Sequence, residues 1–393
     1  MNVFLIAGEP SGDRLGGALM AGLRDLDPGV RFLGVGGSEM AAQGLKSLFP
    51  MDELSVMGLA EVLPRYFALR RRIHETAAAI DAAAPDVVIT IDSPDFCLRV
   101  LRRARAARPG LPTVHYVAPS VWAWRPGRAA KMAPLVDHVL ALLPFEPPYM
   151  RDAGMSCDFV GHPVVAEPLA STAEARAFRA EHGIGDAPLI LALPGSRRGE
   201  VERLAPRFGA ALHDVLAHRP KARIVVPTVA AQAERLRALI ADWPGAPILL
   251  DPASSPPAAK RAAFRAADVA LAASGTVSLE LAANGVPMVI AYDFHPLTRP
   301  LIRRLVRLET ATLVNLVSDT RAVPEFLLEA CRPDRIAPAL VSLLDDPQAQ
   351  AQQREAMELT MQRLGRGNRP PGQRAALSVR DFLAHRQARA AGA

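Results

Sequence analysis

Short apolar runs alternate with longer amphipathic stretches along the chain. Runs of this length bounded by turn residues predict strands buried on both faces, and the stretches between them predict helices. The predicted strands are 3–7, 31–35, 86–91, 113–117, 136–142, 157–160, 189–193, 222–227, 248–250, 269–272 and 287–291. Strands that alternate with helices form parallel sheets through right-handed crossovers. The pattern therefore predicts an α/β protein with two Rossmann-like parallel-sheet domains facing a cleft.

The domain boundary is predicted in a polar, alanine-rich segment at 167–181. A chain of 393 residues is too long for one compact core. We expect a first domain over 1–168, a second over 169–365, and a C-terminal segment over 366–393. The ligand is expected in the cleft between the domains. The segment 312–316 is predicted to be extended.

Composition places the chain among globular proteins, with 50% hydrophobic and 22% charged residues. Three widely spaced cysteines indicate a reducing compartment without a disulfide framework or a zinc site. The N-terminal apolar run is short, lacks a preceding basic region and ends in a glycine turn. It is interpreted as a strand and not as a signal peptide. No apolar run is long enough to span a bilayer.

The net charge of +6 and pI of about 9.6 suit phosphate ligands, anionic lipid or nucleic acid. Only 5% of residues are aromatic, and no RRM, zinc-finger or basic-helix pattern occurs. We therefore expect no nucleic-acid partner.

The segment 189–200 carries the first candidate site. Pro194-Gly195-Ser196 ends its strand, and a helix is predicted from Glu200 onward. Free N–H groups at a helix start, together with Arg197 and Arg198, suit a phosphate. A similar turn follows at 272–276. One such turn is also compatible with an ordinary link carrying exposed arginines, but two in one chain favour a nucleotide-sugar site.

Asp92 is the candidate general base. It follows the strand 86–91, and ligands of open α/β sheets bind at the carboxyl ends of strands. A partly desolvated carboxylate there is suited to accept a proton. Asp95 is expected to cap the following helix, and Ser38 the helix at 38–43.

The turn over 8–13 only loosely resembles a dinucleotide fingerprint, which disfavours NAD.

Three other features each leave two interpretations open. The loop 118–125, with Trp122 and Trp124, either lines a substrate site or fills a domain edge. A histidine at a strand end, such as His162, is more often structural. The basic segment 55–73 either lies on an anionic membrane or packs in the core with its arginines in water.

Several motifs together resemble the bacterial lipid-A-disaccharide synthases. The two most specific blocks are Ile91-Asp92-Ser93-Pro94-Asp95-Phe96 and His115 to Arg125, and the others are 7–13, 57–63, 193–197 and 274–276. The resemblance implies a GT-B fold and an inverting, metal-independent transferase without a cofactor. It would join UDP-2,3-diacylglucosamine to 2,3-diacylglucosamine 1-phosphate in β-1,6 linkage. It would act on the cytoplasmic face of the inner membrane.

The resemblance also implies roles for individual residues. Asp92 would be the base, and the UDP-binding residues would be Ser196, Arg197, Gly275, Thr276, Glu280 and Asn315. Ser11 would bind substrate or nucleotide, and Glu9 and Asp13 would either bind the acceptor or only shape the turn over 8–13. The residues expected to face acyl chains or the phospholipid surface are Val62, Leu63, Tyr66, Leu69 and Arg70. In-line attack requires the base and the phosphate site to face each other.

Two positions depart from the family pattern. Asp293 stands where a basic residue is common, which leaves a phosphate contact there open, and Val314 stands where proline is common. A UDP-N-acetylglucosamine 2-epimerase on the same fold is the alternative function. A transferase acting on a different lipid-linked acceptor is disfavoured by the block around Trp122.

Overall fold

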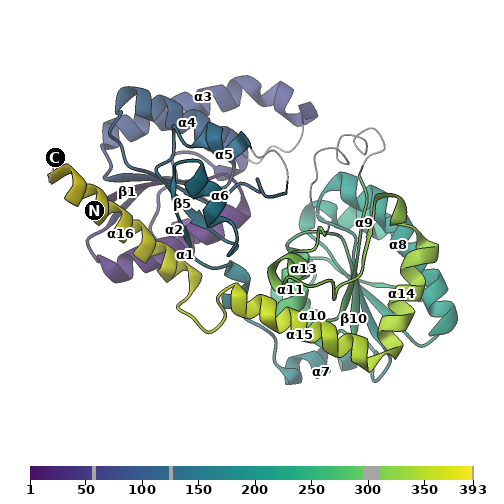
Figure 1. Cartoon of the computed structure of the whole chain (residues 1–393). Helices are drawn as coiled ribbons and strands as arrows, with labels where there is room; N and C mark the ends of the chain where they lie inside the picture. Colours follow the sequence, from purple (N-terminus) through teal and green to yellow (C-terminus); the bar gives the residue numbers. More distant parts are fainter. Residues whose placement is uncertain (55–58, 124–126, 295–309, 392–393) are drawn as a thin grey trace. The chain divides into compact units, whose positions relative to one another are not determined.

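Two compact units make up the chain in a computed structural model that describes residues 1–54, 59–123, 127–294 and 310–391, with the side chains of 59–66 and 390–391 outside the description (Figure 1). The first unit contains Met1–Ala166 and Leu364–Ala393, and the second contains Glu167–Arg363.

The N-terminal unit is built on a parallel sheet. Its six described strands run in the order β2-β1-β3-β4-β5-β6. Their bounds are β1 Asn2–Ala7, β2 Arg31–Val35, β3 Val87–Ile91, β4 Thr113–Tyr116, β5 His138–Ala141 and β6 Ser156–Phe159. The apolar runs form these strands because both faces of the sheet are covered by helices. The predicted α/β class is confirmed.

Helices cover the two faces of this sheet in separate groups. One core cluster lies under α1 (Pro10–Leu26) and α16 (Pro371–Ala391), and the other lies under α3 and α4. The remaining bounds are α2 Ser38–Ala42, η1 Met51–Glu53, α3 Leu59–Ala83, α4 Pro94–Ala107, α5 Gly127–Met132, α6 Pro147–Asp152 and η2 Pro163–Ala166.

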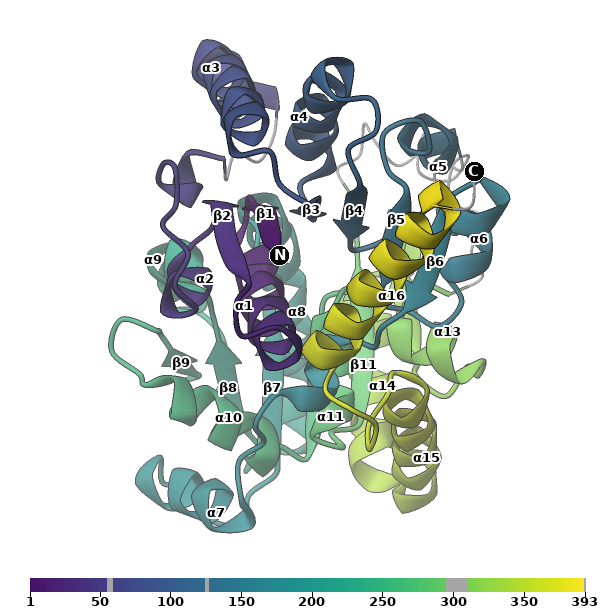
Figure 2. The same ribbon diagram turned by 90° about the vertical axis from the view of Figure 1, so that its left-hand side faces the viewer.

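The C-terminal helix α16 belongs to the first unit. It lies beside α1 in both ribbon views (Figures 1 and 2). A Cβ on Gly22 would come within 2.8 Å of the carbonyl oxygen of Gly372, so the two backbones approach at a point where a side chain would not fit. The chain therefore returns to its first sheet after leaving the second unit.

The C-terminal unit repeats the arrangement. Its described part contains six parallel strands in the order β12-β11-β10-β7-β8-β9. Strand bounds are β7 Leu189–Leu193, β8 Arg223–Pro227, β9 Ile248–Leu250, β10 Val269–Ala272, β11 Met288–Tyr292 and β12 Glu325–Leu327. Helix bounds are α7 Thr172–Glu181, α8 Arg198–His218, η3 Ala230–Gln232, α9 Ala233–Leu239, α10 Pro257–Ala266, α11 Val277–Ala283, α13 Leu313–Ser318, η4 Leu328–Ala330, α14 Pro333–Asp345 and α15 Pro347–Arg363.

Three local predictions are wrong. The segment 312–316 lies mostly in the helix α13 and is not extended. The N-cap position of α2 is held by Gly37, with Ser38 as the first helical residue. Asp95 lies inside the first turn of α4, whose N-cap position is held by Ser93. The short edge strand β12 was not predicted.

Candidate functional site

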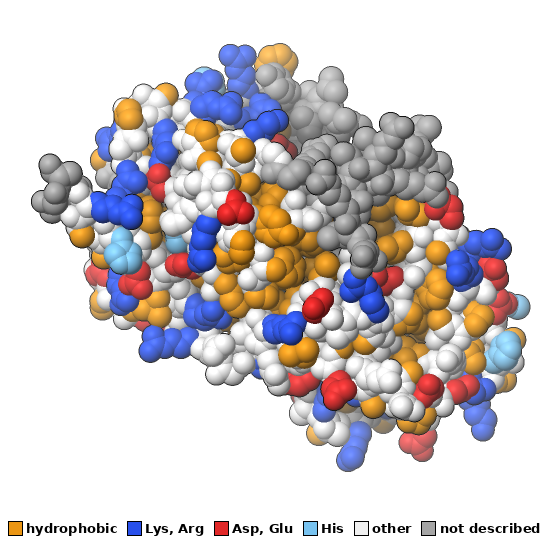
Figure 3. Space-filling view, in the orientation of Figure 1, with side chains coloured by type: hydrophobic (Ala, Val, Ile, Leu, Met, Phe, Trp, Pro, Cys, Tyr) orange, Lys and Arg blue, Asp and Glu red, His pale blue; other side chains and the backbone are white. Residues whose placement is uncertain are grey.

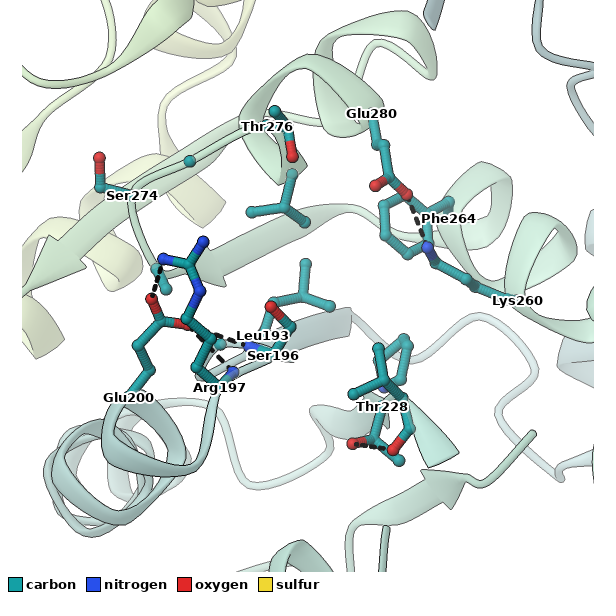
Figure 4. Close-up of a pocket in the computed structure, with 16 residues that line it drawn as sticks. Leu193, Ser196, Arg197, Glu200, Thr228, Lys260, Phe264, Ser274, Thr276 and Glu280 are labelled. Atoms are coloured by element: carbon teal, nitrogen blue, oxygen red, sulfur yellow. Dashed lines mark hydrogen bonds and ion pairs between the residues drawn. The ribbon is translucent and has the colours of Figure 1, made fainter. Parts of the chain in front are cut away.

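A cavity of about 360 Å³ opens in the C-terminal unit at the carboxyl ends of its central strands. It brings together Ser196 and Arg197 of one turn, Gly275 and Thr276 of a second turn, and Glu280 of the helix α11 that follows the second turn (Figure 4). A parallel sheet aligns the carboxyl ends of neighbouring strands at one edge, and β10 pairs directly with β7. The size is that of a small-ligand site.

Glu200 fixes the first turn. Its Oε2 accepts the backbone N–H groups of Ser196 and Arg197, each at 3.2 Å. Its Oε1 accepts the hydroxyl of Tyr292 at 3.0 Å. The backbone N–H groups at the Ser196 turn were expected to be free to bind a phosphate. They instead bond to a carboxylate of the helix that follows, α8. The Arg197 guanidinium, with 67% of its side chain exposed, remains accessible in the cavity.

The second turn is open to the cavity. Gly275 has φ +149°, and a Cβ there would meet no other group within 4 Å. Ser278 Oγ donates to the Gly275 carbonyl at 2.8 Å, and Ser274 Oγ donates to the Ala311 carbonyl at 3.1 Å. These bonds hold the turn while the glycine leaves space for a ligand to approach the backbone.

Glu280 has a partner that the sequence did not predict. Its Oε2 lies 2.6 Å from the Nζ of Lys260, and this ammonium lies 5.2 Å from the ring centre of Phe264. Lys260 and Phe264 line the same cavity. The one available signal was that Lys260 is among only four lysines in the chain.

Asn315 is a structural residue in this arrangement. It is 1% exposed, and its Nδ2 donates to the Val323 carbonyl at 2.9 Å while its Oδ1 accepts the Val323 N–H at 3.0 Å. Nδ2 also donates to Thr310. The amide thus ties α13 to the loop before β12, and it is not among the described residues that line the cavity.

Asp293, the first departure from the family pattern, pairs with a residue of its own unit. The carboxylate is buried, and its Oδ2 lies 2.9 Å from Nη2 of Arg207. Its carbonyl accepts a bond from Arg203. The acidic residue therefore pairs with a basic residue of α8. Val314, the second departure, is fully buried in α13.

Asp92 lies at the carboxyl end of β3 in the N-terminal unit. It is half-buried, and its N–H donates to the Tyr116 carbonyl at 3.0 Å. Asp92 and Ser93 have φ values of 52° and 43°, in the left-handed region that favours glycine. Consecutive residues in this region store backbone strain of the kind found at functional sites.

The turn over 8–13, which leads into α1, lies against Asp92 and Ser93. A Cβ on Gly8 would come within 2.5 Å of the Ser93 hydroxyl, so a side chain at Gly8 would collide with Ser93 unless Ser93 moved. Glu9 is half-buried and Ser11 is exposed, both at the start of α1. The structure therefore places Glu9 on the turn that adjoins the strained strand end.

Asp13 has a structural role. It is 3% exposed, and its carboxylate accepts the backbone N–H groups of Gly37, Glu39 and Met40 at 2.7, 2.9 and 3.1 Å. A carboxylate with three such donors caps α2, although it lies far from that helix in the sequence. This geometry supports a structural role for Asp13, but its carboxylate shapes the turn before α2 and not the turn over 8–13.

Trp122 is anchored by a residue that the sequence did not identify. Its indole N–H donates to Glu146 Oε1 at 3.3 Å, and its ring packs edge-to-face on Phe145 with centres 5.1 Å apart. Burial raises the pKa of Glu146 to about 7 despite its hydrogen bonds. Trp124 and Arg125 lie outside the described residues.

The contacts of His162 favour a structural role for this residue over a catalytic one. Its Nδ1 accepts the N–H of Val164 at 3.2 Å, and burial lowers the pKa of the ring to about 4. A ring that stays neutral at physiological pH and bonds locally holds the turn after β6.

Residues 59–73 of the basic segment form the N-terminal part of α3, and 55–58 lie outside the described residues. Val62, Leu63 and Tyr66 lie among the residues whose side chains are not described. Leu69 is half-buried and packs against the core, and its contact with acyl chains stays a prediction. Arg70 is exposed, and Phe67 is 78% exposed.

Charge is distributed unevenly over α3. Arg72 pairs with Glu53 and Glu75 and stacks on Phe49, so it acts within the unit. Basic side chains nevertheless gather at the surface over α3 (Figure 3).

No described group of His, Cys, Asp and Glu side chains is placed to hold a metal ion. None of the described helices has the length and apolar character needed to cross a membrane.

The two parallel-sheet units define a GT-B-like fold. Similar solved structures include the UDP-GlcNAc 2-epimerase of Neisseria meningitidis, bound to UDP-GlcNAc, with a TM-score of 0.65 and 12% identity over 98% of this chain and 100% of that chain. Another is the Methanocaldococcus jannaschii UDP-GlcNAc 2-epimerase, with a TM-score of 0.57 and 12% identity over 98% and 100%. At such identities the likeness shows the fold alone.

The sequence identifies the family within this class. The model of the family described as Lipid-A-disaccharide synthetase matches residues 3–377. Relatives named Lipid-A-disaccharide synthase are 64% identical in Ruegeria pomeroyi, over 98% of this chain and 96% of the relative, and 50% identical in Rhodospirillum centenum, over 98% and 95%. The chain belongs to this family and is a glycosyltransferase of lipid A biosynthesis. The sequence relatives thus favour the transferase over the epimerase.

Proposed function

We propose that the chain condenses UDP-2,3-diacylglucosamine with 2,3-diacylglucosamine 1-phosphate. The products are a β-1,6-linked disaccharide 1-phosphate and UDP. The observation that carries this proposal is the 64% identity to a relative named Lipid-A-disaccharide synthase over 98% of the chain. The cavity of the C-terminal unit supports it because its side chains suit a nucleoside diphosphate.

The donor would bind in that cavity. Arg197 supplies a planar, permanently charged group suited to the diphosphate, and Gly275 and Thr276 let the phosphates approach the backbone. Glu280 supplies a carboxylate that can accept hydrogen bonds from ribose hydroxyls. Positive charge placed beforehand stabilises the negative charge that develops on the leaving UDP.

In the proposed reaction, Asp92 accepts the proton of the acceptor 6-hydroxyl. The resulting oxygen nucleophile attacks C1 of the donor sugar and forms the new C–O bond. The bond from C1 to the phosphate oxygen breaks, and its electron pair leaves with UDP. In-line attack inverts the configuration at C1, and neither a metal nor an organic cofactor takes part.

The acyl chains of both substrates imply contact with the phospholipid surface at the cytoplasmic face of the inner membrane. Exposed Phe67 and Arg70 lie on one side of α3, three residues apart, beside Val62, Leu63 and Tyr66 in sequence. Apolar and basic groups together favour an anionic bilayer. Replacing Val62, Leu63 and Tyr66 with Ser should reduce sedimentation with anionic vesicles, whereas Leu26→Ser, on α1, should not.

Mass spectrometry of the products tests the reaction. Purified protein given UDP-2,3-diacylglucosamine and 2,3-diacylglucosamine 1-phosphate should yield the disaccharide 1-phosphate. Loss of a general base should lower kcat by about 10²- to 10⁴-fold in Asp92→Asn and leave UDP affinity unchanged. Asp95→Asn, at an exposed position on the same turn, is the control. Near-normal turnover of Asp92→Asn would contradict the assignment of the base.

A further inference from the structure

The ion pair between Lys260 and Glu280 lies at one end of the cavity, away from Arg197 and Glu200 at the other (Figure 4). Lys260 Nζ is 2.6 Å from Glu280 Oε2. The two residues come from different helices, α10 and α11, that follow different strands. Their contact therefore depends on the folded arrangement of the cavity and is not a pairing along one helix.

The Lys260 ammonium is fixed from a second side. It lies 5.2 Å from the ring centre of Phe264, one helical turn further along α10. Phe264 is 2% exposed, so the ring is held by the core. A cation between a carboxylate and an aromatic face has a defined position, in contrast to a lysine extended into solvent.

Glu280 alone would be poorly placed for the ligand proposed above. A nucleoside diphosphate brings negative charge into a cavity that already holds this carboxylate, and like charges disfavour each other at short range. The ammonium offsets that charge and bonds to one oxygen, Oε2. The other oxygen, Oε1, then has a fixed direction in which to accept a hydrogen bond.

We propose that Lys260 is a specificity-determining residue of the nucleotide site, which holds Glu280 so that its carboxylate selects nucleotides with ribose hydroxyls. The inference rests on the proposed UDP-sugar function and assigns a role to a residue outside the motifs of the sequence. A site built to bond hydroxyls rejects an analogue that lacks them, because its polar groups are then left unpaired.

Calorimetric titration with UDP and with 2′,3′-dideoxy-UDP tests this role. The unmodified protein should bind UDP about tenfold more tightly than the dideoxy analogue. Lys260→Met keeps an unbranched side chain of similar length, shorter by one atom, and removes the charge. It should weaken UDP binding about fivefold, a modest effect because both side chains are partly exposed. Dideoxy-UDP binding should weaken by a smaller factor of about two, because the loss of the offsetting charge acts on both nucleotides and the loss of the fixed carboxylate acts on UDP alone.

Two further variants sharpen the result. Lys260→Arg keeps the charge and should restore the preference for UDP. Glu280→Gln should itself weaken UDP binding, and adding Lys260→Met to that variant should weaken it little further, because both substitutions act on one interaction. Lys221→Met, at an exposed lysine of the same unit, is the matched control and should leave both affinities unchanged.

Equal weakening of UDP and dideoxy-UDP by Lys260→Met would overturn the proposal, because it would show a general charge effect without selection of the ribose. Failure of the unmodified protein to bind UDP, or to form the disaccharide, would overturn the proposed function itself. A protein that forms the disaccharide but binds both nucleotides equally would overturn only the role of Lys260.

Discussion

The hydroxyl of Tyr292 donates a hydrogen bond to the carboxylate of Glu200 at 3.0 Å and thereby joins the end of β11 to the first turn of α8. The same carboxylate accepts the N–H groups of Ser196 and Arg197. Gly195 has φ +115°, and a Cβ there would come within 2.6 Å of the Glu200 Cβ. Glu200 therefore serves as an internal anion that shapes the turn.

The first prediction concerns this support. Glu200→Ala should weaken UDP binding about tenfold and lower the free energy of unfolding by about 1 kcal/mol, because the turn that carries Arg197 loses its fixed points and α8 loses its cap. Calorimetry and urea denaturation measure the two effects. Glu202→Ala, which removes a more exposed carboxylate of the same helix, is the control. Unchanged UDP affinity in Glu200→Ala would show that Arg197 needs no such support.

The second prediction concerns the contact between Gly8 and Ser93. Gly8→Ala should destabilise the N-terminal unit by about 1–3 kcal/mol, because its Cβ would lie 2.5 Å from the Ser93 hydroxyl. It should also lower kcat by displacing Asp92, the neighbour of Ser93. Adding Ser93→Gly removes the collision and suits the left-handed φ of 43°, so the double variant should recover most of the lost stability. Additive losses would contradict the contact.

Much of the fold was predictable because each strand is a continuous apolar run buried on both faces. The strand Val87–Ile91 is fully buried along its length, as its composition indicates. The segment at α13 was not predictable in this way, because its conformation depends on bonds from Asn315 to Val323, a residue eight positions away. Tertiary hydrogen bonds therefore decided a conformation that local pattern assigned wrongly.

The candidate site was predictable only where one turn carries its own signal. The turns at Ser196 and Gly275 show glycine and polar residues at strand ends, and both line the cavity. Lys260 and Glu146 carry no such signal, since their partners Glu280 and Trp122 lie 20 and 24 residues away. Spacing along the chain cannot reveal pairs that only folding creates.

The third prediction is a pH dependence that originates at Glu146. Burial raises its pKa in the folded protein from 4.5 to about 7, so the folded state binds more protons than the unfolded state between these values. Stability should therefore fall as pH rises from 4.5 to 7, by up to about 3 kcal/mol, and change little from this group above that range.

Urea denaturation at pH 5.0 and 7.5 measures this effect. Glu146→Gln resembles the protonated form and cannot ionise, so the variant should lose less stability than the unmodified protein over the same interval. The Trp122 fluorescence should respond in parallel, because its indole N–H bonds to Glu146. An identical pH dependence in both proteins would assign the titration to another group.

The fourth prediction separates the two interpretations of Asp13. Its carboxylate accepts three backbone N–H groups, and an amide has only one oxygen with which to accept them. Asp13→Asn should therefore lower the free energy of unfolding by about 2 kcal/mol, while the KM for the acceptor stays within twofold in the protein that remains folded. Asp25→Asn, at an exposed position near the other end of α1, is the control and should change neither quantity. A rise in acceptor KM with unchanged stability would instead make Asp13 a substrate-binding residue, and its three backbone bonds would then have to be exchanged for bonds to the acceptor.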